Sequence, residues 1–445
     1  MRKHVEWLFR ELEGWVADGI LRPEQAAALR GRYAAMAHPG RAWGVILFGA
    51  FGAVVAGLGV ILLFAYNWQD MPKAAKLGTV FASLLLAHGA GLELRRRGRQ
   101  PALADAVQLL GTMMFGAGIW LVAQIYHISA HYPNAFFIWA AGALLFAWLL
   151  PSVSHGVLAS ILLALWASTE AASFSQSLLT PPLLILLGGG LLAWRQRSPT
   201  LLVAAQLAFV AALVASIRDA WLVWPTLLAL AAAWLAGGTL AELRSPHFPL
   251  GGKVLRTLGF ILAVAALFPL TFRDAMRHWS PPDWFVPGEG ARTLWFFLPL
   301  AAGLGLAAVA AARAITARDW FSASSLRAAW LPLAMLAAYA GTFIHRELVG
   351  ETGFDLLWSG LFSLVYLGFA GMLFRRGIGE GRFAPMTGGA LLLGAWVFAR
   401  YCDWFESLLA RGLAFLLLGA ALFSLALLVA RSRRQLQPAP ETTVN

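Results

Sequence analysis

Polar and aromatic side chains gather at three places where long apolar runs of this chain end. FAYNWQDMP follows the first run, AQIYHISAHYPN closes the third, and RYCDW begins at Arg400. Carboxylate and amide oxygens beside aromatic rings could bind a cationic or amphipathic molecule. We therefore take ten residues as candidates for a ligand-binding cavity: Asn67, Trp68, Gln69, Asp70, Gln124, Tyr126, His127, His131, Tyr401 and Asp403.

The histidines could also do metal or proton chemistry. His127 and His131 are four residues apart, so on a helix they would share one face, with Glu170 or Asp70 as a third metal ligand. Pro133 follows closely and argues against a helix there. We expect interfacial or protonatable histidines, with no metal and no cofactor. The sequence shows no phosphate-binding loop, HExxH or GxSxG motif, so we assign no catalytic residue and favour a protein that is not an enzyme.

A plainer explanation of the same residues stays open. Polar groups at the ends of membrane spans are solvated at little cost, and Trp residues there form an aromatic belt. Glu170 and Glu347 fall at such ends, where we expect them to be hydrated. Within the apolar runs the polar candidates are His88, Asp105, Gln108, His155 and Gln206. We expect these to bond between helices, with Asp105 and Gln108, three residues apart, facing one neighbour.

The elements that must position these residues are membrane-spanning helices. The chain has 445 residues, of which 60% are hydrophobic and 13% charged, whereas soluble domains carry about 25% charged residues. Apolar runs of about 20 residues, the length that crosses a bilayer as a helix, recur along the chain. We predict an all-α integral membrane protein with about 14 spans, which start near Trp43, Ala74, Leu103, Asn134, Val153, Leu178, Leu201, Trp221, Leu255, Thr293, Ala328, Leu356, Pro385 and Leu408.

The basic residues predict how these spans are oriented. With the N-terminus inside, the inner segments hold 25 of the 34 Lys and Arg residues and the outer segments hold nine. This is the asymmetry of the positive-inside rule, and it places both termini in the cytoplasm. The formal net charge of +12 therefore reflects orientation and attraction to anionic lipid heads rather than nucleic-acid binding.

We divide the chain into three parts. Residues 1–40 form a cytosolic helical hairpin, because Leu8, Leu12 and Trp15 recur at helical spacing and Gly19 and Pro23 suit a helix end and a helix start. Residues 41–431 form the transmembrane bundle, and residues 432–445 a disordered cytosolic tail. The hairpin either lies against the membrane or docks a cytosolic or membrane protein partner.

Several stretches carry a resemblance to a known family. FAYNWQDMPKAAKLG, LEGWVADGILRPEQAAALRGRY, LVAQIYHIS and YCDWFESLLARGLAFLLLGAALF are similar to the bacterial membrane-protein family called domain of unknown function 2157. The resemblance is best over residues 5–168 and the last two spans. It implies a multi-pass protein of the bacterial inner membrane and supplies no activity or cofactor. Asn67, Trp68, Gln124, Tyr126 and His127 fall at polar positions that recur in the family.

The sequence is compatible with three functions. The first is a transporter or a lipid or small-molecule translocator whose outward cavity is formed by the first, third and thirteenth spans. The second is a sensor or assembly scaffold that docks a partner through residues 1–40. The third is an intramembrane lipid-modifying enzyme, for which no nucleophile stands out.

Overall fold

The computed structural model describes most of the chain. The described residues are 2–37, 71–98, 100–128, 131–217, 220–244, 247–277, 290–350 and 353–404, with a few positions between 412 and 423. All regular structure in these ranges is helical, with no strand. The all-α prediction is confirmed for this part of the chain. The first and last predicted spans and the tail lie outside it, apart from those few positions.

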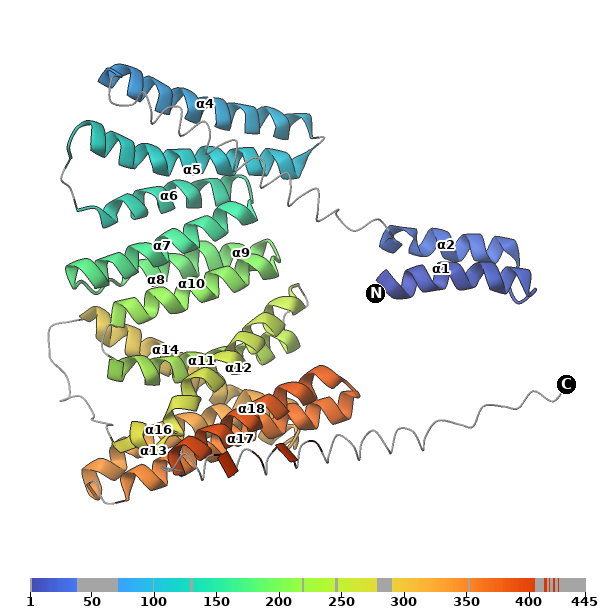
Figure 1. Cartoon of the computed structure of the whole chain (residues 1–445), viewed down its shortest axis with the longest axis vertical. Coiled ribbons are helices and arrows are strands. Elements are labelled where there is room, and N and C mark those ends of the chain that lie inside the picture. The colour runs from blue at the N-terminus through green and yellow to red at the C-terminus, as the bar shows by residue number, and fades with distance from the viewer. Residues whose placement is uncertain are drawn as a thin grey trace. The chain divides into compact units, whose positions relative to one another are not determined.

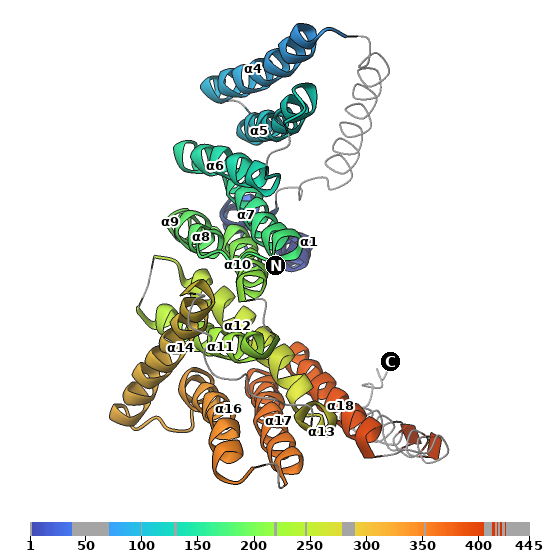
Figure 2. The same cartoon turned by 90° about the vertical axis from the view of Figure 1, so that its left-hand side faces the viewer.

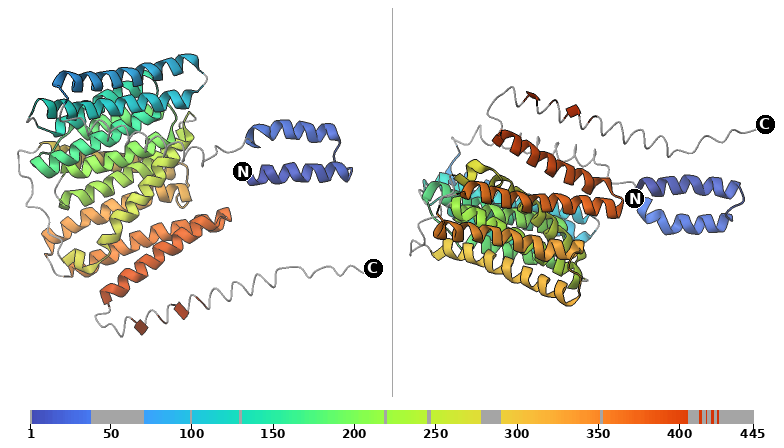
Figure 3. Two further views of the ribbon diagram at one scale, coloured as in Figure 1. Left: turned by 45° about the horizontal axis from the view of Figure 1, so that its top comes forward. Right: turned by 90° about the horizontal axis from the view of Figure 1, so that it is seen from below.

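The chain forms two compact units, Met1–Val80 and Phe81–Asn445. The first contains the predicted hairpin, α1 (Arg2–Ala17) and α2 (Pro23–Ala37). At the end of α1, Gly19 has a positive φ of 70°, and the amides of Gly19 and Ile20 donate to the carbonyl groups of Val16 and Trp15. This is a Schellman motif, which stops a helix and reverses the chain. Figures 1 and 3 show the resulting two-helix hairpin.

The second unit is a series of helices joined mostly by short connections (Figures 1 and 2). The boundary between the two units falls within the first of these helices, α4. In order they are α4 (Lys73–Arg97), α5 (Pro101–Ile125), α6 (Pro133–Leu149), α7 (Val153–Phe174), α8 (Thr180–Leu184), η1 (Ile185–Gly190), α9 (Leu191–Arg195), α10 (Pro199–Ile217), α11 (Ala220–Arg244), α12 (Pro249–Leu270), α13 (Arg273–Arg277), α14 (Gly290–Thr316), α15 (Ala323–Ser325), η2 (Leu326–Trp330), α16 (Leu331–Leu348), α17 (Phe354–Glu380) and α18 (Phe383–Trp404).

Nine helices among the described residues are long and apolar enough to cross a membrane. They include α4, α5, α7, α10, α11, α12, α14, α16 with η2, and α17. The spans predicted from Asn134, Leu178 and Pro385 coincide with helices outside this set, and α6 has only 17 residues. The chain is therefore a multi-pass membrane protein. The total of fourteen spans and the cytoplasmic placement of the termini stay predictions.

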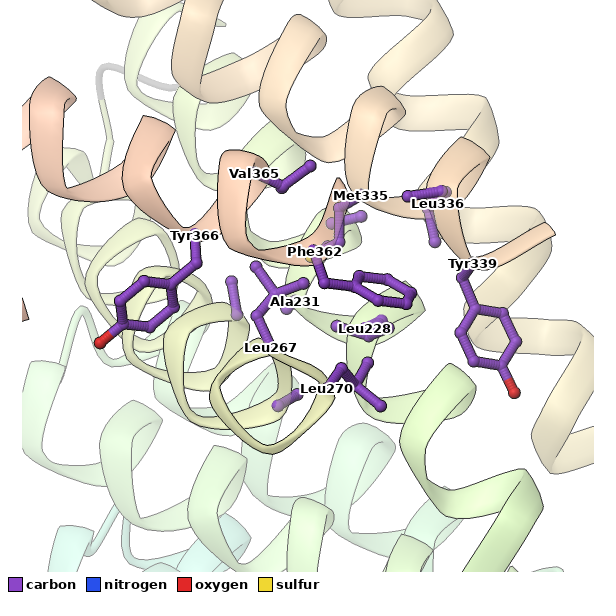
Figure 4. Close-up of a cluster of buried hydrophobic side chains, with 14 of the residues drawn as sticks. Leu228, Ala231, Leu267, Leu270, Met335, Leu336, Tyr339, Phe362, Val365 and Tyr366 are labelled. Atoms are coloured by element: carbon purple, nitrogen blue, oxygen red, sulfur yellow. The ribbon is translucent and has the colours of Figure 1, made fainter. Parts of the chain in front are cut away.

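One hydrophobic core cluster of the second unit lies where α11, α12, α16 and α17 meet. Figure 4 shows side chains from all four helices interleaved in it: Leu228, Ala231, Leu267, Leu270, Met335, Leu336, Tyr339, Phe362, Val365 and Tyr366. Small residues bring α11 and α12 together, because a Cβ on Gly252 would lie 2.6 Å from the carbonyl oxygen of Gly238. Close approach of this kind drives helix association in membranes, where burial of apolar surface contributes little.

A π-helical segment, η1, lies between α8 and α9, over the three consecutive glycines. Two of these glycines pack closely, since a Cβ on Gly188 would lie 2.8 Å from Leu144 and one on Gly189 would lie 2.6 Å from Ser160. The Trp148 indole of α6 also donates to the carbonyl oxygen of Gly188 at 3.2 Å. Close packing therefore accounts for Gly188 and Gly189.

Candidate functional site

The structure places the predicted cavity residues in separate groups. Asn67, Trp68, Gln69 and Asp70 lie outside the described residues. Gln124, Tyr126 and His127 lie at the end of α5, and His131 lies just before α6. Tyr401 and Asp403 lie at the end of α18, which packs on α17, whereas α5 packs on α6 and α7. The described candidates therefore form two groups, which belong to different helix clusters.

His127 and His131 do not share a helical face. α5 ends at Ile125 and α6 begins at Pro133, and His127 has a positive φ of 52° in the turn between them. The His127 ring bonds to the backbone oxygen of Gln124 at 3.0 Å instead. The helical metal-pair geometry is thus wrong, because the chain turns before Pro133. Among the residues that the structure describes, no three His, Cys, Asp or Glu side chains are grouped around a common metal position.

His131 instead meets a carboxylate from another helix. Its Nε2 lies 2.8 Å from Oε1 of Glu170, near the end of α7. The Glu170 side chain is only 5% exposed and that of His131 is 37% exposed. The Trp166 indole donates to the same carboxylate oxygen at 3.2 Å. Our expectation of a hydrated Glu170 was wrong, because His131, Trp166 and the helix packing cover it.

Aromatic rings surround this pair. The Phe174 ring lies 4.0 Å from that of His131, and the Tyr132 hydroxyl bonds to that of Ser173 at 2.7 Å. On the other side, the Phe137 ring lies 4.6 Å from Trp166. The sequence held a signal for this cluster, since Trp166, Glu170 and Phe174 recur every four residues and must share one face of α7.

An apolar crevice begins beside the same cluster. It has a volume of about 460 Å³ and runs along α6 from Phe137 to Trp148, with walls from α7 and α8. Ligand pockets of small molecules have volumes of about 300–1,000 Å³ and mostly apolar walls. Phe137 lines the crevice and stacks on the tryptophan that bonds to Glu170. The carboxylate therefore lies near one end of a space that suits an apolar chain or ring.

A second polar cluster lies at the opposite end of α7. His155 is completely buried, with Nδ1 2.8 Å from the Ser152 hydroxyl and Nε2 3.0 Å from that of Thr112. Asp105 of α5 lies 3.9 Å from the same ring and accepts a hydrogen bond from Ser154 at 2.7 Å. The network ties α5 to α7, as polar residues between membrane helices commonly do.

Gln108 lies deeper in this cluster and faces a different helix from Asp105. Its Cγ packs against Gly91 of α4, 2.4 Å from the position that a Cβ on that glycine would occupy. Neither its amide nitrogen nor its amide oxygen has a partner among the described residues, and the side chain is fully buried. Asp105 turns toward α7 instead. The expectation that Asp105 and Gln108 share one neighbour is therefore wrong, because a spacing of three residues separates them by about 60° around the helix.

The two polar clusters are separated by an apolar layer. His155 and Glu170 are fifteen residues apart on α7, which is a rise of about 22 Å, and residues 156–169 include no ionisable side chain. The polar groups at the two ends are therefore separate sites on one helix.

The comparisons with known proteins agree with the resemblance read from the sequence. Residues 13–156 match the family model described as Predicted membrane protein (DUF2157). The match covers the second helix of the hairpin and α4 to α6, and it ends just inside α7. It does not include the last two spans, where we also saw resemblance. No curated protein and no solved structure matches the chain.

Proposed function

We propose that this protein translocates a cationic amphipathic small molecule or lipid across the bacterial inner membrane. The observation that carries this proposal is the buried carboxylate of Glu170 beside the end of the α6–α8 crevice. A cationic head group would bind Glu170, and the apolar part of the ligand would lie against Phe137 and the crevice wall. Gln124 and Tyr126, both exposed at the end of α5, would contact the ligand as it enters.

A charge exchange at Glu170 follows from the energetics of a buried carboxylate. An ionised carboxylate without a partner in an apolar site costs several kcal/mol. Histidine is the side chain that ordinarily gains and loses a proton near neutral pH. His131 bonds to Glu170 when the site is empty, and a bound cation would take the place of that bond. We propose that a proton leaves the site in exchange, which would couple binding of the cation to the proton gradient.

The cluster around His155 supports this proposal from the other end of α7. It places a second histidine near a carboxylate, Asp105, where the charge distribution predicts the cytoplasmic side. A histidine–carboxylate pair near each end of one helix could take part in proton movement. Ionisable side chains within membrane helices commonly mark ion pathways and proton relays.

The test uses the purified full chain in vesicles. We expect ethidium, an amphipathic cation, to be exchanged for protons when a pH gradient is imposed, as measured by ethidium fluorescence and by a pH dye inside the vesicles. Glu170→Gln removes the charge but keeps the shape, and we expect it to reduce the flux at least tenfold. Glu347→Gln is the matched control, because Glu347 is an exposed carboxylate at the end of α16. A parallel measurement with a fluorescent phospholipid tests lipid as the substrate.

The outcome against the proposal is equally concrete. If Glu170→Gln folds normally and transports both probes as the wild type does, or if the wild type moves neither, Glu170 is not a transport site. Normal transport by the variant would mean that the contact between His131 and Glu170 only holds α7 against the loop that precedes α6.

A second candidate function follows from the hairpin of α1 and α2, which belongs to its own compact unit. We propose as the alternative that residues 1–40 dock a cytosolic or membrane protein partner and that the membrane part anchors a scaffold. A chain without residues 1–40 separates the two ideas in the same vesicles. Loss of a co-purifying partner with flux retained would favour docking, and unchanged co-purification would contradict it.

A further inference from the structure

A charged cavity lies in another part of the second unit. Its volume is about 280 Å³, and Met276, Arg277, Arg346, Phe354 and Asp355 line it. These residues come from the short helix α13, the end of α16 and the start of α17. The volume is just below the range of about 300–1,000 Å³ for small-molecule sites, so the cavity suits a small polar group.

One carboxylate in this cavity accepts bonds from two arginines. Oδ2 of Asp355 lies 3.0 Å from Nε of Arg277 and 3.3 Å from Nη2 of Arg273. A third arginine, Arg346, holds its guanidinium 5.5 Å from the centre of the Phe354 ring. Among the residues that line the cavity, two are therefore positively charged and one is negatively charged.

The place of these arginines in the membrane topology is unusual. Only nine Lys and Arg residues fall in segments that the charge distribution predicts to lie outside, and Arg273, Arg277 and Arg346 are three of them. A fourth, Arg400, is buried and donates to the carbonyl oxygen of Thr271, two residues before Arg273. Chains that follow the positive-inside rule place few basic residues outside. Close grouping of four of them indicates a requirement for positive charge there.

We propose that this cavity binds a phosphate group between Arg277 and Arg346. Guanidinium groups bind phosphate through paired, charge-assisted hydrogen bonds, which are stronger than bonds between neutral groups. Asp355 is the internal counter-ion, which holds Arg273 and Arg277 in position while the cavity is empty. The anion belongs either to a solute in water or to a lipid head group. This site is separate from the cation site proposed at Glu170 and does not depend on it.

The first test measures whether an anion shields these arginines from a reagent. The full chain is placed in nanodiscs of neutral phosphatidylcholine and treated with phenylglyoxal, which modifies arginine, with inorganic phosphate or with chloride at equal ionic strength. A second set of nanodiscs contains phosphatidylglycerol. Peptide mass spectrometry then reports modification at Arg277 and Arg346. Arg375 is the internal control, because it is exposed at the opposite end of α17.

We expect at least one anion to slow modification of Arg277 and Arg346 severalfold while Arg375 reacts as before. Protection by inorganic phosphate in neutral nanodiscs indicates a soluble anion. Protection only by phosphatidylglycerol indicates a lipid head group. Equal rates at Arg277 and Arg346 under all conditions, or equal protection at Arg375, would overturn the proposal.

Two substitutions should change the anion concentration needed for half-maximal protection, one raising it and the other lowering it. Arg277→Gln removes one charge-assisted bond, and we expect about tenfold more anion to be needed, read from protection of Arg346. Asp355→Asn removes the competing carboxylate, and we expect less anion to be needed. Weaker binding by a folded Asp355→Asn variant would contradict the role of Asp355 as a counter-ion. The wild-type labelling test stands even if neither variant folds.

Discussion

Side chains of the same type in this protein lie in very different surroundings. Glu170 and Glu347 both follow long apolar runs near span ends, yet Glu170 is buried against His131 and Glu347 is exposed. His155 is buried and bonded through both ring nitrogens, whereas His127 is exposed and bonds to the end of the helix that precedes it. The buried members of each pair are those whose loss leaves other polar groups without partners.

The His155 network gives a prediction at this scale. We expect His155→Ala to lower the free energy of unfolding by about 2–4 kcal/mol, because it opens a cavity and removes bonds to the Ser152 and Thr112 hydroxyls. The measurement is unfolding in detergent with increasing sodium dodecyl sulfate, followed by circular dichroism. His247→Ala is the control, since His247 is exposed. Equal stability of the two variants would show that the network contributes nothing.

At the scale of elements, helix contacts depend on small residues. α11 is the most buried of the nine candidate spans, and Gly238 and Gly252 each lie directly against the backbone of the other helix, α12 or α11. The crevice in which we propose that a ligand lies is lined by other helices, α6, α7 and α8. Different helices of the second unit thus form the close-packed core and the proposed ligand site.

A methyl group at one of these contacts should separate two helices. We expect Gly252→Ala to destabilise the protein by about 1–3 kcal/mol, because the added Cβ would overlap the backbone of α11 and the helices must shift. Gly305→Ala on α14 has no atom within 4 Å of its Cβ, and we expect little change there. Thermal unfolding in detergent compares the two variants. A stable Gly252→Ala protein would mean that α11 and α12 can move apart without loss.

At the scale of the whole molecule, both proposals depend on which side of the membrane each proposed binding site faces. The charge distribution puts two regions on the outer side of the membrane. One is formed by the ends of α5 and α7, near Glu170, and the other is the cavity around Asp355. The same distribution puts the loop between α9 and α10, with Arg195 and Arg197, on the inner side. If the true orientation were inverted, the proposed ligands would enter from the cytoplasm instead.

Cysteine labelling measures this orientation directly. In a Cys402→Ser background, we expect a membrane-impermeant maleimide to label Tyr126→Cys in intact bacterial spheroplasts and to leave Arg197→Cys unlabelled. Both positions are exposed in the structure. Permeabilised cells provide the control, in which both variants should react. The reverse pattern in intact cells would show that the termini face outward and that the charge-based orientation is wrong.

The sequence by itself determined that this is an all-helical, multi-pass membrane protein, and it located a helix at every predicted span within the described residues. Hydropathy can do this because a helix satisfies its own backbone hydrogen bonds, so its position depends on local composition. The sequence also indicated the ends of the hairpin helices through Gly19 and Pro23, whose effects are local too.

Only the tertiary structure decided which polar residues meet. Glu170 pairs with His131 across 39 positions, and Arg277 pairs with Asp355 across 78. It also decided that His127 leaves the helix and that Asp105 and Gln108 face different neighbours. The rotation of each helix about its axis and the path of each loop set these contacts, and packing against other helices fixes both. No local pattern in the chain contains that information.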